Sequence, residues 1–186
     1  VMVSRAATLE MIEFLDLLEP AIAHAVVDEI PGSGGRFSFR HALIRETIFD
    51  DLSPAVRIRL HGDVRDALEQ LFLADPDRYA AELAHHALAA APLGDERFVE
   101  HGVRAARSAM QHMAFEEAVR VYERTIDAMV HARPDERRRC ELLLALAEAK
   151  EWANDRGGSR EAVEEAAEIA RSLDAPELLA RAALAV

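Results

Sequence analysis

Alanine recurs at helical spacing through most of this chain, and it does so on segments that prolines and glycines separate. Residues three or four apart lie on the same face of an α-helix, so such a segment presents a stripe of small side chains. Small side chains let two helix backbones approach closely. Alanine, leucine, glutamate and arginine dominate the composition, whereas aromatic residues make up only 5%. We therefore expect helices packed on helices, and neither a sandwich nor a barrel.

The breaks between these segments contain residues that are typical of helix ends. Ser53-Pro54 and Asp75-Pro76 each place a capping side chain before a proline, as at a helix start. Further breaks are expected at 92–94, 132–134, 155–158 and 174–176. The intervening helices would be roughly 14 to 20 residues long, which suits antiparallel pairing across short loops.

The first sixty residues follow a different pattern. An amphipathic helix is expected over 8–26, interrupted by Pro20. Branched and aromatic residues at 26–30 and 36–39 flank the Gly-rich stretch 31–35, which predicts one β-hairpin at about 26–39. A helix over 41–52 follows. This order is similar to the back half of a winged helix.

The later part resembles the tetratricopeptide repeat, in which small residues let two helices approach and an aromatic fills the adjacent groove. Ala105-Ala106, Ala118 and the aromatics Phe115 and Tyr122 carry the resemblance. A looser second unit carries alanines at 145, 147 and 149 and at 162, 166 and 170. The expected fold is all-α with one small β-hairpin: a winged-helix-like subdomain over 1–60, then tetratricopeptide-like antiparallel hairpins over 61–186 that form an α-solenoid.

Charge and cysteine content narrow the function. The formal net charge is −12, from 22 basic and 34 acidic residues, so the chain as a whole should repel nucleic acid. Cys140 is the only cysteine, and no apolar stretch is long enough to span a bilayer or resembles a signal peptide. We expect a cytoplasmic location. Both ends read as cut from a longer protein, with repeats that continue past residue 186.

A wider resemblance covers most of the chain from about Leu15. The segment from Arg36 to Phe49, the string Glu82-Leu83-Ala84-His85-His86 and the block from Phe115 to Arg124 look like bacterial signal-transducing ATPases of the AAA/STAND type. These regulators join an ATPase module to a helical-repeat sensor and often to a LuxR-type DNA-binding domain; related modules are fused to nucleotide cyclases.

The resemblance places the catalytic machinery outside this chain. The chain has no Gly-x-x-x-x-Gly-Lys-Ser/Thr phosphate loop and no recognisable magnesium-positioning acidic motif. ATP, ADP and Mg²⁺ are expected only in the missing ATPase module. We expect no enzyme activity, no catalytic residue and no metal site here.

His41 is the candidate cofactor contact. The resemblance implies a histidine between hairpin and helix that reaches the phosphates of bound ADP in the full-length protein, and His41 occupies that place. Imidazole can donate a hydrogen bond to phosphate and titrates near neutrality. Its neighbours Arg40 and Ala42 differ from the Met and Asp often found there. The alternative is a histidine that caps the helix by chance of position.

Candidate partner-binding residues fall into two groups. Arg36, Arg40 and Arg45, with two further arginines at 57 and 59, form the most basic stretch. This stretch could dock on an acidic ATPase surface, contact DNA or be a solvated helix face. Tyr122 and Trp152 could line a groove on a helical array, or be core residues.

Together these features predict a non-catalytic sensor and arm segment of an ATP-dependent transcriptional or signalling regulator. Its partners would be its own ATPase module and an effector protein or small-molecule inducer, with no membrane and no direct nucleic acid; a second copy of the chain is a further candidate. The alternative is a DNA-binding winged-helix protein with a helical dimerisation body.

Overall fold

The chain is helical with one small sheet. The computed structural model describes residues 11–32, 36–73, 75, 77–132 and 135–185. Within them lie nine α-helices, one short 3-10 helix and one two-stranded antiparallel sheet. The expected all-α class with a single small hairpin is therefore confirmed. No helix in this described part combines the length and apolar character needed to cross a membrane.

The chain divides into two compact units, Val1–Leu71 and Phe72–Val186. The domain boundary that we expected near residue 60 falls inside a continuous helix, because no proline or glycine break occurs between Pro54 and Leu71 that ends it. Gly62 is accommodated in that helix, where it is buried.

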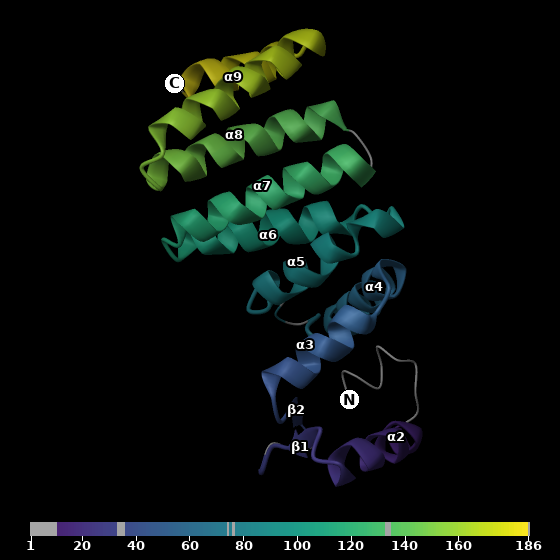
Figure 1. Cartoon of the computed structure of the whole chain (residues 1–186). Coiled ribbons are helices and arrows are strands. Elements are labelled where there is room, and N and C mark those ends of the chain that lie inside the picture. Colours follow the sequence, from purple (N-terminus) through teal and green to yellow (C-terminus); the bar gives the residue numbers. More distant parts are fainter. Residues whose placement is uncertain (1–10, 33–35, 74, 76, 133–134, 186) are drawn as a thin grey trace. The chain divides into compact units, whose positions relative to one another are not determined.

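In its described residues, the first unit contains three helices and the sheet. Its elements are α2 Met11–Ala23, β1 Val27–Glu29, β2 Phe37–Phe39, α3 Ala42–Asp51 and α4 Pro54–Leu71 (Figure 1). The strands pair Val27 with Phe39 and Glu29 with Phe37, inside the predicted range. The predicted turn at 33–35 and the start of the first helix before residue 11 lie outside the described residues.

Local interactions explain how α2 meets the hairpin. Pro20 lies within α2 and neither ends it nor begins a second helix. Ala25 takes a left-handed conformation after the helix, and Val26 N–H then donates to the Ala21 carbonyl at 2.9 Å. Phe14 packs edge-to-face on Phe37, with ring centroids 6.4 Å apart. This aromatic pair links α2 to β2.

The second unit is a series of helices in which each packs on the next along the chain. Its elements are α5 Ala80–Ala89, the 3-10 helix Ala91–Leu93, α6 Arg97–Gln111, α7 Phe115–Ala132, α8 Glu136–Trp152, α9 Arg156–Ser172 and α10 Pro176–Leu184. Figure 1 shows α6, α7, α8 and α9 lying one beside another. Their mutual faces enclose one apolar core.

Three turns in this unit, those between α6 and α7, α8 and α9, and α9 and α10, share one backbone geometry. Met113, Asn154 and Asp174 each adopt a positive φ, between 50° and 62°. The residue after each donates its N–H to the carbonyl five positions earlier: Ala114 to Ala109 (2.9 Å), Asp155 to Lys150 (2.8 Å) and Ala175 to Ala170 (3.0 Å). This is the hydrogen bond of a Schellman-type helix end. The helices are thus joined by near-identical connections.

Two expected helix boundaries are wrong. The break predicted at 155–158 is confined to its first residue: Asp155 caps α9 by accepting the Gly158 N–H at 3.0 Å, so both glycines lie in the first helical turn. The helix expected to begin at Asp75-Pro76 begins at Ala80. Asp75 accepts a weak bond from Arg78 N–H (3.4 Å), and Pro76 lies outside the described residues.

Small residues set how closely α6 and α7 approach. Ala106 and Ala118 are fully buried between helices. A Cβ added to Gly102 would lie 2.2 Å from Thr125 Oγ1, so only glycine fits there. The buried Thr125 hydroxyl donates to the Val121 carbonyl at 2.7 Å and leaves no unsatisfied donor in the contact.

The next pair of helices, α8 and α9, has its own close contacts. The Ser159 hydroxyl donates to the Ala147 carbonyl at 2.9 Å, and the Cys140 thiol lies 3.2 Å from the Ala166 carbonyl. Both contacts are buried and both join side chain to backbone across the helix pair. The backbones therefore approach closely enough for a short side chain to reach the neighbouring main chain.

Gly102→Ala should destabilise the second unit by about 1–3 kcal/mol, because its methyl group overpacks the contact with Thr125. Combining it with Thr125→Ala, which removes the nearest atoms, should recover part of that loss. Urea unfolding of the whole chain, followed by circular dichroism, gives both values.

Gly157→Ala is the matched control. Gly157 is exposed, and its added Cβ would meet nothing nearer than 3.9 Å, so the change should stabilise α9 by about 0.5–1 kcal/mol. Equal effects at the two glycines would contradict the close-approach account.

Candidate binding groove

The second unit carries three adjoining cavities, of about 430, 400 and 250 Å³. All three have Arg138 of α8 in their lining, and the last two also share Val103 and Arg107 of α6. Because their linings overlap, we name these three cavities together the arginine groove. Its basic side chains are Arg104, Arg107, Arg138 and Arg181.

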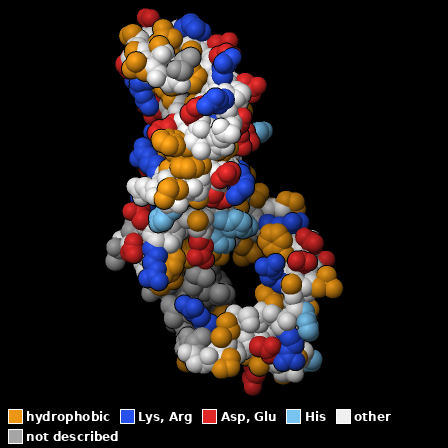
Figure 2. All heavy atoms as spheres, turned by 90° about the vertical axis from the view of Figure 1, so that its left-hand side faces the viewer, with side chains coloured by type: hydrophobic (Ala, Val, Ile, Leu, Met, Phe, Trp, Pro, Cys, Tyr) orange, Lys and Arg blue, Asp and Glu red, His pale blue; other side chains and the backbone are white. Residues whose placement is uncertain are grey.

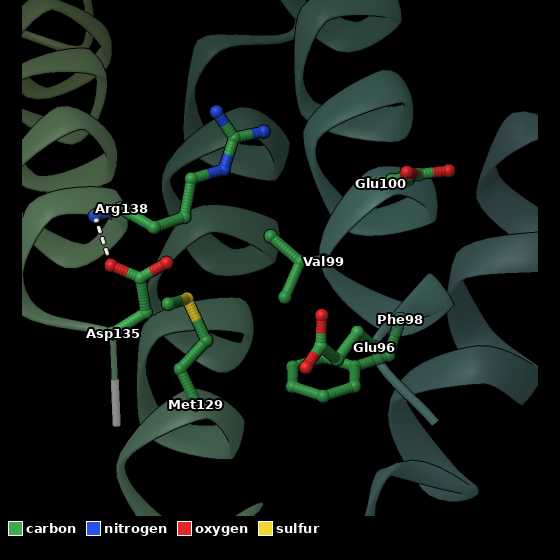
Figure 3. Close-up of a pocket in the computed structure, with 7 residues that line it drawn as sticks. All are labelled: Glu96, Phe98, Val99, Glu100, Met129, Asp135 and Arg138. Carbon is green, nitrogen blue, oxygen red and sulfur yellow. Dashed lines mark hydrogen bonds between the residues drawn. The ribbon is translucent and has the colours of Figure 1, made fainter. Parts of the chain in front are cut away.

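The largest cavity has an apolar floor and a charged rim (Figure 3). Phe98 and Met129 are buried and form the floor together with Val99. Figure 3 shows the Arg138 side chain directed away from the Asp135 carboxylate, which instead accepts the Arg138 backbone N–H at 3.0 Å as the cap of α8. The guanidinium of Arg138 is therefore not engaged by its own helix cap.

The smallest cavity brings three arginines from three helices around Tyr122. Arg107 belongs to α6, Arg138 to α8 and Arg181 to α10. Arg138 is paired with Glu141, from Nη1 to Oε2 at 2.9 Å. By contrast, neither Arg107 nor Arg181 forms an ion pair with a residue in the described part of the chain. Two of the three cations thus have no carboxylate neutralising them.

Tyr122 is buried, and desolvation raises the pKa of its hydroxyl. Arg107 interacts with that hydroxyl and lowers the pKa, but burial has the larger effect. The nearby Glu148 carboxylate also raises this pKa. A phenol is protonated at neutral pH even without these effects, so the hydroxyl can donate a hydrogen bond. The cavity offers two solvent-exposed guanidinium groups without an ion pair and one neutral hydroxyl donor, which is a set of groups suited to an anion.

Trp152 does not line the cavity that contains Tyr122. Its side chain is 62% exposed and stacks on Phe115, with ring centroids 5.7 Å apart and planes 23° apart. It lines none of the cavities described above. Of the two aromatics suggested by the sequence for a groove, the structure places only Tyr122 in one.

The candidate residues of the first unit lie around the start of α3. His41 directly precedes α3 in an extended conformation, its carbonyl accepts the Ile44 N–H at 3.1 Å, and its exposed side chain makes no capping bond. Arg40 donates two hydrogen bonds to Asp28, at 2.9 and 2.7 Å. This pair, with a smaller effect from His41, lowers the pKa of the Asp28 carboxyl.

Arg36 and Arg45 are both exposed. The Arg36 carbonyl accepts the Ile30 N–H at 2.8 Å as an extension of the hairpin. Arg45 lies 3.8 Å from Glu46. Arg40 and Arg45 therefore each have an acidic neighbour, and Arg40 is already bound by a carboxylate.

The first unit also exposes many large apolar side chains. None of the ten residues of α3 is buried. Large hydrophobics with substantial exposure in this unit include Ile12, Leu15, Leu17, Ile22, Ile30, Phe39, Leu43, Ile48, Phe49 and Leu60. Figure 2 shows hydrophobic side chains reaching the surface in the lower part of the view, where this unit lies. So much unburied apolar surface is typical of an interaction face.

The sequence analysis missed Arg107, Arg138 and Arg181. Arg104 and Arg107 are one helical turn apart, on the helix that carries the Ala105-Ala106 pair, and this spacing was the available signal. Cys140 is buried, and desolvation raises its thiol pKa, which is opposite to the shift an activated nucleophile needs.

The described residues contain no group of three or more His, Cys, Asp or Glu side chains placed to hold a metal ion. Comparison of the chain with models of protein families, with curated proteins and with solved structures gives no match.

Proposed function

We propose that this chain is the sensor and relay part of an ATP-dependent signalling or transcriptional regulator. The first unit is a winged-helix-like subdomain that docks on the protein's own ATPase module. The second unit is a tetratricopeptide-like scaffold whose arginine groove binds an effector. The observation that carries the proposal is the exposed apolar surface of the first unit, centred on α3, in which no residue is buried.

A surface of this kind supports docking because leaving large apolar side chains in water is unfavourable. Each buried Leu or Ile contributes about 1.5–3 kcal/mol. Leu43 is 72% exposed and Ile48 is 46% exposed, and both belong to α3. A partner that covers them would gain this apolar burial as part of its binding free energy.

His41 is placed to act at that surface. Its extended backbone and exposed imidazole let the ring point away from the unit that carries it. The Arg40–Asp28 pair fixes the end of β2 next to it. The proposed role is a hydrogen bond from imidazole to a phosphate of ADP in the ATPase module.

The second unit supports the scaffold role through its regular construction. Successive helices pack pairwise, three turns repeat one geometry, and short side chains lie at the close contacts. Stacked hairpins of this type present extended concave surfaces to ligands. Effector binding in the groove would shift the population of closed and open states, so that ADP leaves the module when the effector is bound.

The coding sequence on the 5′ side of Val1 tests the assignment to a larger regulator. A phosphate loop followed by a magnesium-binding acidic motif would support it. A start codon at this point would contradict it.

His41→Leu, made in the intact protein, should speed ADP release by roughly tenfold or more, because a hydrogen bond to a charged group contributes about 1.5–3 kcal/mol. Stopped-flow exchange of fluorescent ADP measures the rate. His112→Leu, on an exposed histidine of the second unit, is the control and should leave exchange unchanged. Unchanged exchange and unchanged signalling output in the His41 variant would remove His41 from the mechanism.

Leu43→Gln should change the free energy of unfolding of the chain by no more than about 0.5 kcal/mol, because the side chain is exposed. In the intact protein it should nevertheless weaken docking by roughly ten- to a hundredfold. Basal ADP release and limited proteolysis report docking. Val130→Gln, on a half-exposed apolar residue of α7, is the control, and an equal effect there would refute the docking face.

The DNA-binding alternative predicts a different charge distribution. A recognition helix needs basic side chains toward phosphate and base edges. In α3, Arg45 is the only basic residue, whereas Glu46, Asp50 and Asp51 are acidic. We therefore expect no saturable binding of duplex DNA at about 150 mM salt in a fluorescence anisotropy titration; affinity that falls steeply with salt would favour the alternative.

A further inference from the structure

We propose that the cavity beside Tyr122 is a site for the carboxylate of a small organic acid, held by Arg107 and Arg181. This inference rests on the proposed sensor function, since it names the chemical class of the effector that the groove would bind. It commits to a small molecule with one carboxylate and a short apolar body.

The arginines that line this cavity are the first evidence for an anion site. The chain holds 34 acidic residues against 22 basic ones, so most arginines have carboxylates available to them. Arg138 takes one, Glu141, within this same cavity. Arg107 and Arg181 line the cavity with no carboxylate partner among the described residues. Both guanidinium groups are exposed to water, which screens their mutual repulsion. A carboxylate that enters the cavity would therefore meet two cations with no ion-pair partner to displace.

The chemistry of the donors favours a carboxylate. A guanidinium presents a planar fork that matches the two oxygens of a carboxylate. The Tyr122 hydroxyl adds a neutral donor that interacts with Arg107. Donors from α6, α7 and α10 would thus meet one anion, and binding would link helices that are far apart in sequence.

The remaining walls define the rest of the ligand. Val103, Leu142 and Ala145 are apolar and line the same cavity of about 250 Å³. An aliphatic chain of a few carbons can lie on these walls while its carboxylate meets the arginines. A free phosphate would meet the cations but leave the apolar walls without a partner.

Tyrosine NMR tests the site directly, because the chain has only two tyrosines. Chains labelled with ¹³C at tyrosine Cζ give two resonances, and Tyr79→Phe assigns that of Tyr122. Titration with hexanoate, at ionic strength held constant with sodium chloride, should move the Tyr122 resonance saturably and leave that of Tyr79 in place. Hexanamide, the neutral isostere, and inorganic phosphate should move it at least tenfold less at equal concentration.

Substitutions of Arg107 and Arg181 distinguish the effect of positive charge from the effect of the planar guanidinium group. Arg107→Gln with Arg181→Gln should abolish the hexanoate response. Arg107→Lys with Arg181→Lys keeps the charges but loses the forks and should weaken it by roughly tenfold. Arg124→Gln with Arg160→Gln changes two exposed arginines by the same total charge and should leave the response intact.

Several outcomes overturn the proposal. A Tyr122 resonance that does not respond to hexanoate, or responds equally in the Gln variant, refutes the carboxylate site. An equal response to hexanamide refutes the anion requirement, although a sensor for neutral ligands would survive. An Asp–Glu hexapeptide that binds tenfold more tightly than hexanoate refutes the small-molecule occupant. The sensor role itself is judged separately, by the ADP-release measurements on His41 and Leu43.

Discussion

The close approach of neighbouring helices in the second unit is the constraint on which the other features depend. At Gly102 a single added carbon would meet Thr125 at 2.2 Å, so the separation of α6 and α7 is fixed by the absence of a side chain. Ser159 and Cys140 reach backbone carbonyls across the next helix pair, which requires a similarly short separation. The positions of Arg107, Arg138 and Arg181 around Tyr122 follow from this spacing, because each lies on a different helix. The groove therefore depends on the close helix packing at Gly102, Ser159 and Cys140, although none of these three residues lines it.

The two units differ in how much apolar core they bury, although the second unit also exposes large side chains such as Leu184. The second unit buries leucines, valines and alanines in one continuous core and leaves a groove with charged walls. The first unit leaves α3 without a buried residue and holds its hairpin mainly through Phe14 on Phe37 and Arg40 on Asp28. Such a unit gains most of its stability when another surface covers it, because unburied apolar area contributes nothing to folding. The contrast supports a division of labour in which one unit docks and the other binds the signal.

Much of the architecture could be predicted from the sequence, and the parts that could not share a physical cause. The hairpin, the break at 92–94 and the turn at 174–176 are marked by Gly or Pro, so local chemistry determined them. The turn at Met113 is not marked at all, since it uses a left-handed residue without glycine or proline, and only packing of α6 on α7 requires it. At Gly157 and Gly158 the opposite happened: a residue pair that suggested a loop joins α9, because Asp155 caps the helix in front of them. Tyr122 could be anticipated from its spacing to Ala118, whereas Arg107 and Arg181 meet only through tertiary structure.

The repeated turn of the second unit has a consequence for how such a chain can lengthen. Met113, Asn154 and Asp174 adopt the same left-handed backbone and pass the chain to the next helix through the same hydrogen bond. A gene segment encoding one helix pair could be copied at any of these connections and would arrive with a compatible joint at both ends. Each copy would add its own stripe of exposed side chains to the scaffold, free to diverge. A recognition surface built this way can acquire new specificity by duplication, with little change to the contacts that already hold it together.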